Sequence, residues 1–501
     1  MTILVAGSGP AGAFAALGAL QAGASVVMID PGLAAEQNAR QLKEKLGARP
    51  WQSWTPEERS ALKGTSTLSR RQAFGSDFPT RPAHAATIQE KNCRIMQSNA
   101  LGGLSNIWGR GIEPPYGAEC DQWNFKEGFI ESMREVLKHI PLSAEADNLA
   151  EVMPLHTENI TPHRITKESE TLLQKWNRHK TSLNQSGVHF GKTRLAMRPQ
   201  QCQLCGMCFY GCPYGAMFDS GEIISALLRQ YPAFSYRPGL RVKTFAAAGD
   251  NVDVRVENIE DRTCETLQGK KLILAAGAAQ TTAIVMRSLG VRQATLKNSD
   301  LIKIPLFKIF GRSQPEVGYH ALSQLTLTVD HRKITRKAIV IHLFGKNPAI
   351  RDAIVSPFPR RCHALLEKIL APLFSRLFIG MCFLHSDDSA EIEVTDDGKM
   401  TTFSGRRKPG AWGIYWQLLL FFLMHMRKLG LLPLPGSLGL PGSSVHYGAS
   451  VAADDAGQLT AASSVYVADA ASLPCIPAGS YTLSIMANAH RIGKIVGAIS
   501  L

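Results

Sequence analysis

Residues 2–30 read TILVAGSGPAGAFAALGALQAGASVVMID, and this stretch decides the fold. An apolar strand runs into a turn containing Gly7, Gly9 and Gly12, and an alanine-rich helix, a second strand and Asp30 follow. Gly7 permits the tight turn, Gly9 lets the backbone approach a pyrophosphate, and Gly12 lets the helix pack on the strand. Asp30 is placed to accept from a ribose hydroxyl. The complete unit predicts dinucleotide binding in a Rossmann-type domain, and the alternative is an Ala/Gly-rich helix start without a ligand.

Three further stretches resemble the flavin-binding segments of the glucose–methanol–choline oxidoreductases. They are NALGGLSNIWGRGIEPP (99–115), KKLILAAGAAQTTAIVMRSLG (270–290) and SSVHYGASVAADDAGQLTAASSVYVADAASLPCIPAGSYTLSIMANAHRIGKIVG (443–497). The resemblance implies an α/β fold with a Rossmann-type FAD-binding domain and an antiparallel-sheet substrate domain. It also implies that non-covalent FAD is bound by Gly7, Ser8, Gly9, Gly12, Asp30, Gly102, Gly103, Ser105, Asn106, Val242, Ala276, Gly277, Asp469, Ala470, Tyr481 and Thr482.

Four cysteines are clustered in the middle of the chain, at Cys202, Cys205, Cys208 and Cys212, with Pro213 following. This spacing matches bacterial ferredoxins, in which such a run wraps an iron–sulfur cluster. We expect a [4Fe–4S] cluster, with [3Fe–4S] and a structural zinc site as alternatives. The stretch around the run also resembles the flavin subunit of iron–sulfur-containing bacterial sugar dehydrogenases. A cluster beside the flavin would carry electrons away one at a time.

The resemblance places the catalytic base at His446, which would deprotonate a substrate hydroxyl while hydride leaves for the flavin. The second catalytic position of the family, usually His or Asn, is Ser480 here. A hydroxyl is a weaker base, so Tyr481, His320 or His385 could supply the missing group. His490 would lie roughly 15 Å from residue 480 along a helix, which is too far.

The chain of 501 residues is long enough for two or three domains. We expect the FAD-binding domain to comprise 1–118, 223–292 and 444–501, with a mainly helical insertion at 119–195, the iron–sulfur segment at 196–222 and the substrate domain at 293–443. Within this scheme, 240–275 alternates like a small antiparallel sheet, and SQLTLTVD, KAIVIHLF and SAEIEVTDDGKMTTF are strand-like.

The net charge of +14 is unusually basic, and its Lys and Arg residues are scattered. A solvated basic surface, an anionic substrate and an anionic membrane surface each explain it, whereas no nucleic-acid module accompanies the charge. The apolar stretch 412–426, WGIYWQLLLFFLMHM, would reach roughly 22 Å as a helix, too short for a bilayer core of about 30 Å. Basic residues bracket it, so we expect either peripheral membrane contact or a buried helix. The bracketing residues are Arg406, Arg407, Lys408, Arg427 and Lys428.

The sequence therefore predicts an FAD- and iron–sulfur-dependent dehydrogenase of a secondary alcohol, with a sugar or glycoside as the small-molecule substrate. The electron acceptor would be a one-electron protein or a quinone rather than oxygen. A first strand that begins at Thr2 leaves no room for a signal peptide, so we expect a cytoplasmic protein. The alternatives are a reductase of a double bond or ketone, and an electron-transfer subunit with a decayed substrate pocket.

Overall fold

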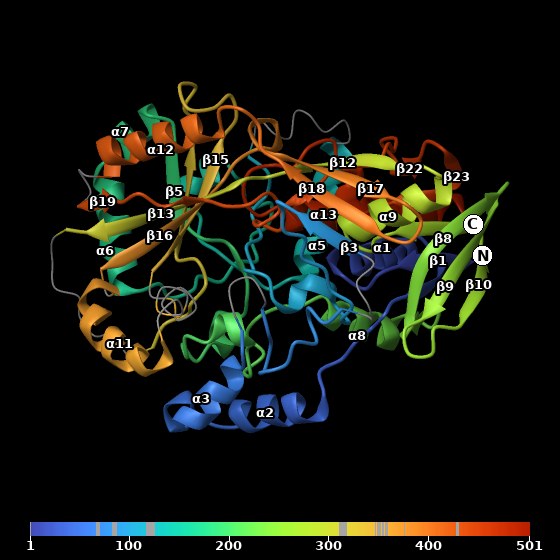
Figure 1. Ribbon diagram of the computed structural model, residues 1–501, viewed down its shortest axis with the longest axis horizontal. Coiled ribbons are helices and arrows are strands. Elements are labelled where there is room, and N and C mark those ends of the chain that lie inside the picture. The colour runs from blue at the N-terminus through green and yellow to red at the C-terminus, as the bar shows by residue number, and fades with distance from the viewer. Residues whose placement is uncertain are drawn as a thin grey trace.

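The fold comes from a computed structural model, which describes residues 2–66, 71–82, 88–116, 126–309, 318–345, 347, 352, 355, 359–374, 376–426 and 430–500 (Figure 1). The domain boundaries given above stay predictions. Among the helices in these ranges, none combines the length and the apolar composition that a membrane span requires.

The molecule has two halves, and a mainly parallel sheet forms the one at the right of Figure 1. Its strand order is β22-β23-β11-β1-β2-β7, and only β22 runs antiparallel to its neighbour. The strands are β1 (Thr2–Ala6), β2 (Ser25–Ile29), β7 (Phe234–Arg237), β11 (Lys271–Leu274), β22 (Gln458–Leu459) and β23 (Ala462–Val467). Strand β1 is central and buried from Ile3 onward, which explains its unbroken apolar sequence.

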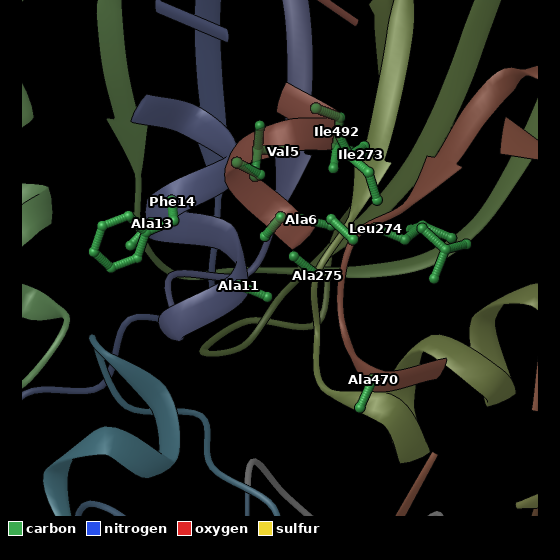
Figure 2. Packing of buried hydrophobic residues seen from close by; sticks show 14 of the residues in the cluster. Val5, Ala6, Ala11, Ala13, Phe14, Ile273, Leu274, Ala275, Ala470 and Ile492 are labelled. Atoms are coloured by element: carbon green, nitrogen blue, oxygen red, sulfur yellow. The ribbon is translucent and has the colours of Figure 1, made fainter. Parts of the chain in front are cut away.

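Two helices pack closely on this sheet, α1 (Pro10–Gln21) and α13 (Thr482–Ile499). A Cβ at Gly18 would lie 2.2 Å from the His490 carbonyl oxygen, and one at Gly493 would lie 2.1 Å from the Ala15 carbonyl oxygen. The glycines therefore let the two backbones touch. Figure 2 shows small and branched side chains of α1, α13, β1 and β11 filling the core beside this crossing. Helix α5 (Lys126–His139) packs against α13.

An antiparallel meander of β8 (Leu240–Ala248), β9 (Asn251–Asn258) and β10 (Cys264–Gly269) packs against β1, β11 and β23. It confirms the alternating pattern read in 240–275. The chain then returns through β11 into α9 (Ala278–Leu289). Helix α8 (Gly221–Gln230) lies between the cysteine run and β7.

A large antiparallel sheet, here called the roof sheet, forms the other half, at the left of Figure 1. Its order is β19-β13-β16-β15-β14-β5, and β20 also pairs with β13. The strands are β5 (Val188–Lys192), β13 (Leu301–Lys308), β14 (Leu325–Val329), β15 (Ile339–Phe344), β16 (Leu377–Phe383), β19 (Leu431–Pro433) and β20 (Ser437–Leu438). Helix α12 (Ala411–Met426) buries one face in the same core as these strands and as α6 (Lys167–Arg178) and α7 (Lys180–Gln185).

A third sheet lies between the two halves in space, with the order β21-β12-β17-β18-β3 (Figure 1). Its strands are β3 (Ile88–Lys91), β12 (Gln293–Asn298), β17 (Glu391–Asp396), β18 (Thr401–Arg406) and β21 (Tyr447–Gly448). The predicted strands of SQLTLTVD, KAIVIHLF and SAEIEVTDDGKMTTF are confirmed as β14, β15 and the β17–β18 hairpin.

The remaining elements connect these sheets. They are α2 (Gln37–Gly47), α3 (Pro56–Lys63), α11 (Arg360–Phe374), the short pair β4 (Leu142–Ser143) and β6 (Leu195–Ala196), and single 3-10 turns at Trp51–Ser53, Gly103–Asn106, Asn148–Glu151, Pro199–Gln201, Cys208–Tyr210, Ser386–Asp388 and Ala470–Ser472.

Candidate active site

A cavity of about 380 Å³ lies between the carboxyl ends of the parallel strands and the roof sheet. One end is lined by the turn after β1, and the other by His342 on β15, Phe383 on β16 and the loop that carries His446. Ligands of open parallel sheets bind at this edge. The cavity thus joins the predicted dinucleotide site to the predicted catalytic residue.

The glycine turn leaves open space at the amino end of α1. A Cβ on Gly12 would lie 1.8 Å from the Gly7 carbonyl oxygen, whereas a Cβ on Gly9 would meet no atom within 4 Å. Helix α1 has no side-chain cap at Gly9 and no acidic residue in its first turn. Its first amide groups therefore remain free for an anion, because the amino end of a helix carries unsatisfied N–H donors and a partial positive charge. This geometry fits the pyrophosphate of FAD.

Asp30 lines the cavity, but its carboxylate also holds the turn together. It accepts from the Ser8 amide (3.0 Å), the Ser8 hydroxyl (2.7 Å) and the Tyr236 hydroxyl (3.0 Å). Burial raises the pKa of Asp30 to about 6 against the opposing effect of these bonds. The Ser8 hydroxyl in turn accepts from the Gly102 amide (3.0 Å). Ser8 therefore links the first turn to the segment 99–106.

The segment 99–106 contributes less of its surface to the cavity than the sequence suggested. Gly103 lines the cavity, whereas Gly102, Ser105 and Asn106 lie behind it. The Ser105 hydroxyl donates to the Gly102 carbonyl (2.5 Å), and the Asn106 amide nitrogen donates to the carbonyls of Leu101 (2.9 Å) and Gly103 (2.8 Å). These side chains shape the turn that presents Gly103. Gly12 likewise packs against the turn and does not line the cavity.

The other predicted cofactor residues all line the cavity: Gly7, Ser8, Gly9, Val242, Ala276, Gly277, Asp469, Ala470, Tyr481 and Thr482. Asp469 accepts from the Gly277 amide (2.9 Å), the Thr281 hydroxyl (2.5 Å) and the Ala471 amide (2.9 Å). Burial raises its pKa to about 6. The Asp469 side chain thereby fixes the end of β23 to the start of α9.

His446 stands at the roof end of the cavity in a strained loop. The preceding residue, Val445, has φ +64°, a left-handed conformation that a β-branched residue rarely adopts. The imidazole stacks on Phe383 and meets Tyr481 edge-on, each at 4.9 Å between ring centroids. Its Nδ1 is buried and has no hydrogen-bond partner among the described residues. Burial, followed by the charge of His342, lowers the pKa of His446 to about 3, so the ring is neutral.

A second imidazole at this end, His342, was missed by the sequence analysis. Its Nε2 lies 2.9 Å from an oxygen of Glu113, which is 1% exposed and also accepts from the Thr326 hydroxyl (2.9 Å). Burial opposes the charge of Glu113, but His342 and these hydrogen bonds hold its pKa below the usual value. An ionised carboxylate only accepts, so Nε2 is the donor and Nδ1 is left for a ligand.

Ser480 lies beside His342. A Cβ added at Gly111 would be 2.1 Å from the Ser480 hydroxyl oxygen and 3.4 Å from His342 Cε1. The only sequence signal for His342 is that it is the single titratable residue in the apolar run 338–344. That signal is weak, because a lone histidine in a strand is usually structural.

Two of the three alternatives for the missing catalytic group lie away from the cavity. His320 is 1% exposed and packs edge-on against His163 at 5.0 Å. His385 is fully buried, and its Nδ1 accepts from the Asp387 amide (3.1 Å). Neither lines the cavity. Tyr481, the third alternative, does line it, with its hydroxyl donating to the Tyr447 carbonyl (3.3 Å).

The cysteine run folds into a single loop in which all four cysteines are half-buried. The charges of Cys202, Cys205 and Cys212 all act on Cys208, so the four sulfurs lie near one another. Burial, with the neighbouring thiols, raises the pKa of Cys205 to about 12. The Cys208 sulfur accepts from the Ala321 amide (3.3 Å). Apolar side chains of Leu195, Met197, Met217 and Leu322 surround the loop.

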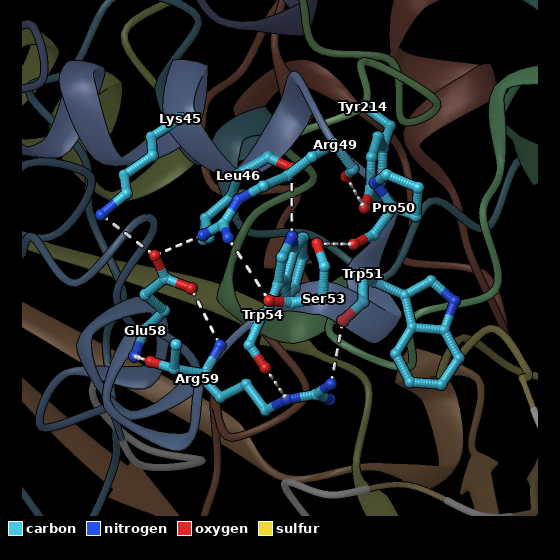
Figure 3. Close-up of polar contacts among 11 residues, drawn as sticks. Lys45, Leu46, Arg49, Pro50, Trp51, Ser53, Trp54, Glu58, Arg59 and Tyr214 are labelled. Atoms are coloured by element: carbon cyan, nitrogen blue, oxygen red, sulfur yellow. Dashed lines mark hydrogen bonds and ion pairs between the residues drawn. The ribbon is translucent and has the colours of Figure 1, made fainter.

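Helices α2 and α3 brace this loop from outside (Figure 3). Tyr214 stacks on Trp54, with ring centroids 5.8 Å apart, and donates from its hydroxyl to the Arg49 carbonyl (2.9 Å). Figure 3 shows Glu58 joining the two helices through Lys45 and Arg49. The hairpin 37–63, to which the sequence analysis gave no role, therefore covers the loop.

The loop also borders the cavity, since Phe209, which follows Cys208, lines it and contacts Phe344 of the roof sheet (6.1 Å between centroids). Beside the loop, Arg110 is buried, and its Nη1 and Nη2 donate to the carbonyls of Trp108 (2.5 Å) and Asn106 (3.2 Å). Burial lowers the pKa of Arg110 to about 10, and the charges of Asp219, Cys212 and Cys208 oppose this. An anionic group in the loop would compensate this buried cation.

No group of three or more His, Cys, Asp or Glu side chains within the described ranges is arranged to hold a metal ion. A structural zinc site needs four ligands converging on one atom, with Zn–S distances of about 2.3 Å. Within the described ranges the structure therefore shows no preformed site for zinc, and none for the expected iron–sulfur cluster. A cluster spreads its thiolates over several iron atoms rather than one.

No protein-family model matches the chain, and no curated protein matches its sequence. Its fold is nevertheless shared with a solved structure, the crystal structure of pyridoxine 4-oxidase from Mesorbium loti. The TM-score is 0.57 and the sequence identity 14%, over 99% of this chain and 98% of that one. At this identity the likeness concerns the fold alone. It supports the expected α/β fold, in which a parallel sheet with the glycine turn is combined with a large antiparallel sheet.

Proposed function

We propose that this chain is an FAD-dependent dehydrogenase that oxidises a secondary alcohol, a sugar or glycoside hydroxyl, and passes electrons to an acceptor other than oxygen. The observation that carries the proposal is the placement of two imidazoles, His446 and His342, at the end of the cavity opposite an open pyrophosphate cradle. The sugar class rests on the resemblance in sequence. Pyridoxine, the compound after which the structural neighbour is named, should be tested as a substrate together with the sugars.

The proton chemistry follows from the charges at the roof end. A neutral His446, which lines the cavity, can take the hydroxyl proton on its imidazole. His342, held by Glu113, can contact the same oxygen through Nδ1 and orient it. The ionised Glu113 offsets the positive charge that proton transfer brings into this buried pocket. When bound, FAD supplies the acceptor for the hydride that leaves the carbinol carbon, and the product is a ketone.

The cysteine loop is proposed to hold a [4Fe–4S] cluster, ligated by Cys202, Cys205, Cys208 and Cys212. Three observations support this: the ferredoxin spacing, the gathering of the four half-buried cysteines in one loop beside apolar side chains, and the buried Arg110 next to them. Phe209 places the loop next to the cavity. Such a cluster accepts single electrons, which suits a one-electron protein or a quinone as the final acceptor.

Peripheral contact with an anionic membrane is proposed for α12. The helix buries Tyr415, Leu418 and Phe422 but presents an apolar stripe to solvent. The stripe consists of Trp412 (54% exposed), Trp416 (56%), Leu420 (54%), Leu423 and Met424. Exposed tryptophans on an apolar helix face suit a membrane interface, and the net charge of +14 favours anionic lipid. Arg427 and Lys428 lie outside the described residues.

Replacing His446 by Ala should slow reduction of bound flavin by substrate about 10²–10⁴-fold, the usual cost of losing a general base. Bound FAD should remain stoichiometric, because His446 is assigned to proton transfer. In the unmodified protein, a base with a pKa of about 3 is already neutral above pH 5. The single-turnover rate should therefore be flat between about pH 5 and 8. An unchanged rate in the variant, measured by anaerobic stopped-flow, would make His446 structural.

Glu113→Gln keeps the size of the side chain but removes its charge. We expect the flavin-reduction rate to fall at least about tenfold, equivalent to ~1.4 kcal/mol of transition-state stabilisation, with little change in substrate affinity. Asp387→Asn is the matched control, since it neutralises a carboxylate beside His385, outside the cavity. Equal effects of the two changes on rate would remove Glu113 from the catalytic pair.

Anaerobically purified protein should contain about three or four irons per chain with matching acid-labile sulfide. Substrate added without oxygen should first bleach the flavin and then change the paramagnetic resonance signal of the cluster. Cys205→Ala should preserve the bleaching but suppress transfer to a one-electron acceptor. Cys264→Ala, an exposed cysteine outside the run, should change neither.

Two results would contradict this assignment. Stoichiometric zinc without sulfide would exclude the cluster, and a cluster signal that stays silent during turnover would exclude its role in electron exit. A low-potential donor that reduces first the cluster, then the flavin, then an added ketone would reverse the direction and favour a reductase.

The double change Trp412→Ser and Trp416→Ser should abolish co-sedimentation with phosphatidylglycerol-containing vesicles at low salt. Added salt should also weaken the binding of the unmodified protein, because part of the attraction is electrostatic. Leu365→Ser with Ile369→Ser, which removes exposed apolar residues of α11, is the control. Failure of the unmodified protein to bind such vesicles would refute membrane contact through α12.

A further inference from the structure

Three cations line the substrate side of the cavity, and the proposed chemistry uses none of them. They are Arg71, in the segment after α3, Arg94, in the segment after β3, and Lys303, on β13 of the roof sheet. Three basic side chains facing one cavity repel one another, so the arrangement is unfavourable unless an anion occupies the space between them.

Strand register places Lys303 on the same face of the roof sheet as His342. Lys303 is opposite Met381 on β16, and Met381 is opposite His342 on β15. All three side chains line the cavity. Since neighbouring strands lie about 4.8 Å apart, Lys303 and His342 are separated by roughly 10 Å across the sheet. That spacing suits two groups of one sugar-sized molecule.

No carboxylate in the described part of the chain neutralises these cations. Arg71 Nη1 donates to the Ile107 carbonyl (2.6 Å), its Nε is buried without a partner, and its guanidinium lies over the Phe209 ring (5.0 Å). The side chains of Arg94 and Lys303 form no ion pair within the described ranges. Two acidic residues line the cavity, Asp30 and Asp469. Each already accepts hydrogen bonds from protein donors, the hydroxyls of Ser8 and Thr281.

The mutual repulsion of the three cations affects Lys303. Burial, followed by repulsion from Arg71 and Arg94, lowers the pKa of its ammonium group. Burial lowers the pKa of Arg71 to about 10. The pyrophosphate of FAD does not account for these charges, because the open amino end of α1 provides its own donors at the other end of the cavity.

We propose that the substrate carries an anionic group, a carboxylate or a phosphate, which Lys303, Arg94 and Arg71 bind while the hydroxyl to be oxidised lies between His446 and His342. Resting on the proposed function, this assignment narrows the substrate to acidic sugars. Arginine pairs with both carboxylate and phosphate in a forked geometry, so the shared feature is the anion.

The test is equilibrium binding, which does not depend on turnover. FAD-loaded protein is titrated by calorimetry with glucose, glucuronate and glucose 6-phosphate, and with the corresponding galactose series. At least one anionic sugar should bind ten or more times more tightly than its neutral parent. Whether the uronate or the phosphate binds best distinguishes the two sources of charge. Equal affinities within both series would overturn the proposal.

Lys303→Met keeps the length of the side chain and removes its charge. It should weaken binding of the preferred anion at least tenfold, leave the neutral sugar unaffected and retain FAD. Lys308→Met, on the same strand but outside the cavity, should change nothing. A loss of FAD in Lys303→Met, or equal weakening of neutral and anionic sugars, would overturn the proposal. Tight anion binding without flavin reduction would instead refute the dehydrogenase assignment and leave the anion site standing.

Discussion

The turn after β1 is the constraint on which the site depends. Gly7 approaches the end of β11 so closely that a Cβ would lie 2.5 Å from the Ala275 carbonyl oxygen, and Gly12 packs onto Gly7 in the same way. These contacts fix the amino end of α1 at the carboxyl edge of the sheet, with its amide groups facing the cavity. The Ser8–Asp30 bonds and the bond from the Gly102 amide then tie a distant segment to the same edge. A cradle for an anion and one wall of the cavity follow from that single close approach.

Features encoded over a short span were predictable from the sequence. The parallel unit at residues 2–30, the meander at 240–275 and strands β14 and β15 depend on local apolar periodicity and on glycine geometry, and they appear where expected. The Glu113–His342 pair was not predictable, because its members are 229 residues apart and meet only in the folded chain, where Glu113 also bonds Thr326, the residue opposite His342. The resemblance in sequence pointed to His446, whereas His342, proposed here to take the place of the second catalytic group that Ser480 does not supply, lies on β15 of the roof sheet. Lys303 escaped notice for the same reason, since strand register alone brings it into line with His342.

The cysteine loop illustrates how spacing and surroundings carry different information. Spacing predicted a group of four sulfurs, and the structure brings them into one loop with an apolar shell. It also adds two features that spacing did not contain, the supporting hairpin of α2 and α3 and the buried Arg110. A buried guanidinium bonded to neutral carbonyls is poorly compensated, so its position beside thiols favours a negatively charged occupant. The shared wall at Phe209 connects this loop to the cavity.

Charge is divided along the cavity in a way that suits oxidation of an anionic alcohol. At the roof end, burial lowers the pKa of His446 and keeps it neutral. Burial also opposes the charge of Glu113, but His342 and the Thr326 hydroxyl lower its pKa and keep it ionised. If His446 takes the substrate proton, the ionised Glu113 offsets part of the cost of burying the positive charge of the imidazolium. The cations Arg71, Arg94 and Lys303 lie where they would attract a substrate anion without pairing with Glu113, which His342 and Thr326 already occupy. Separate partners for the two charges would allow the pocket to bind an anion and still withdraw a proton, as proposed above.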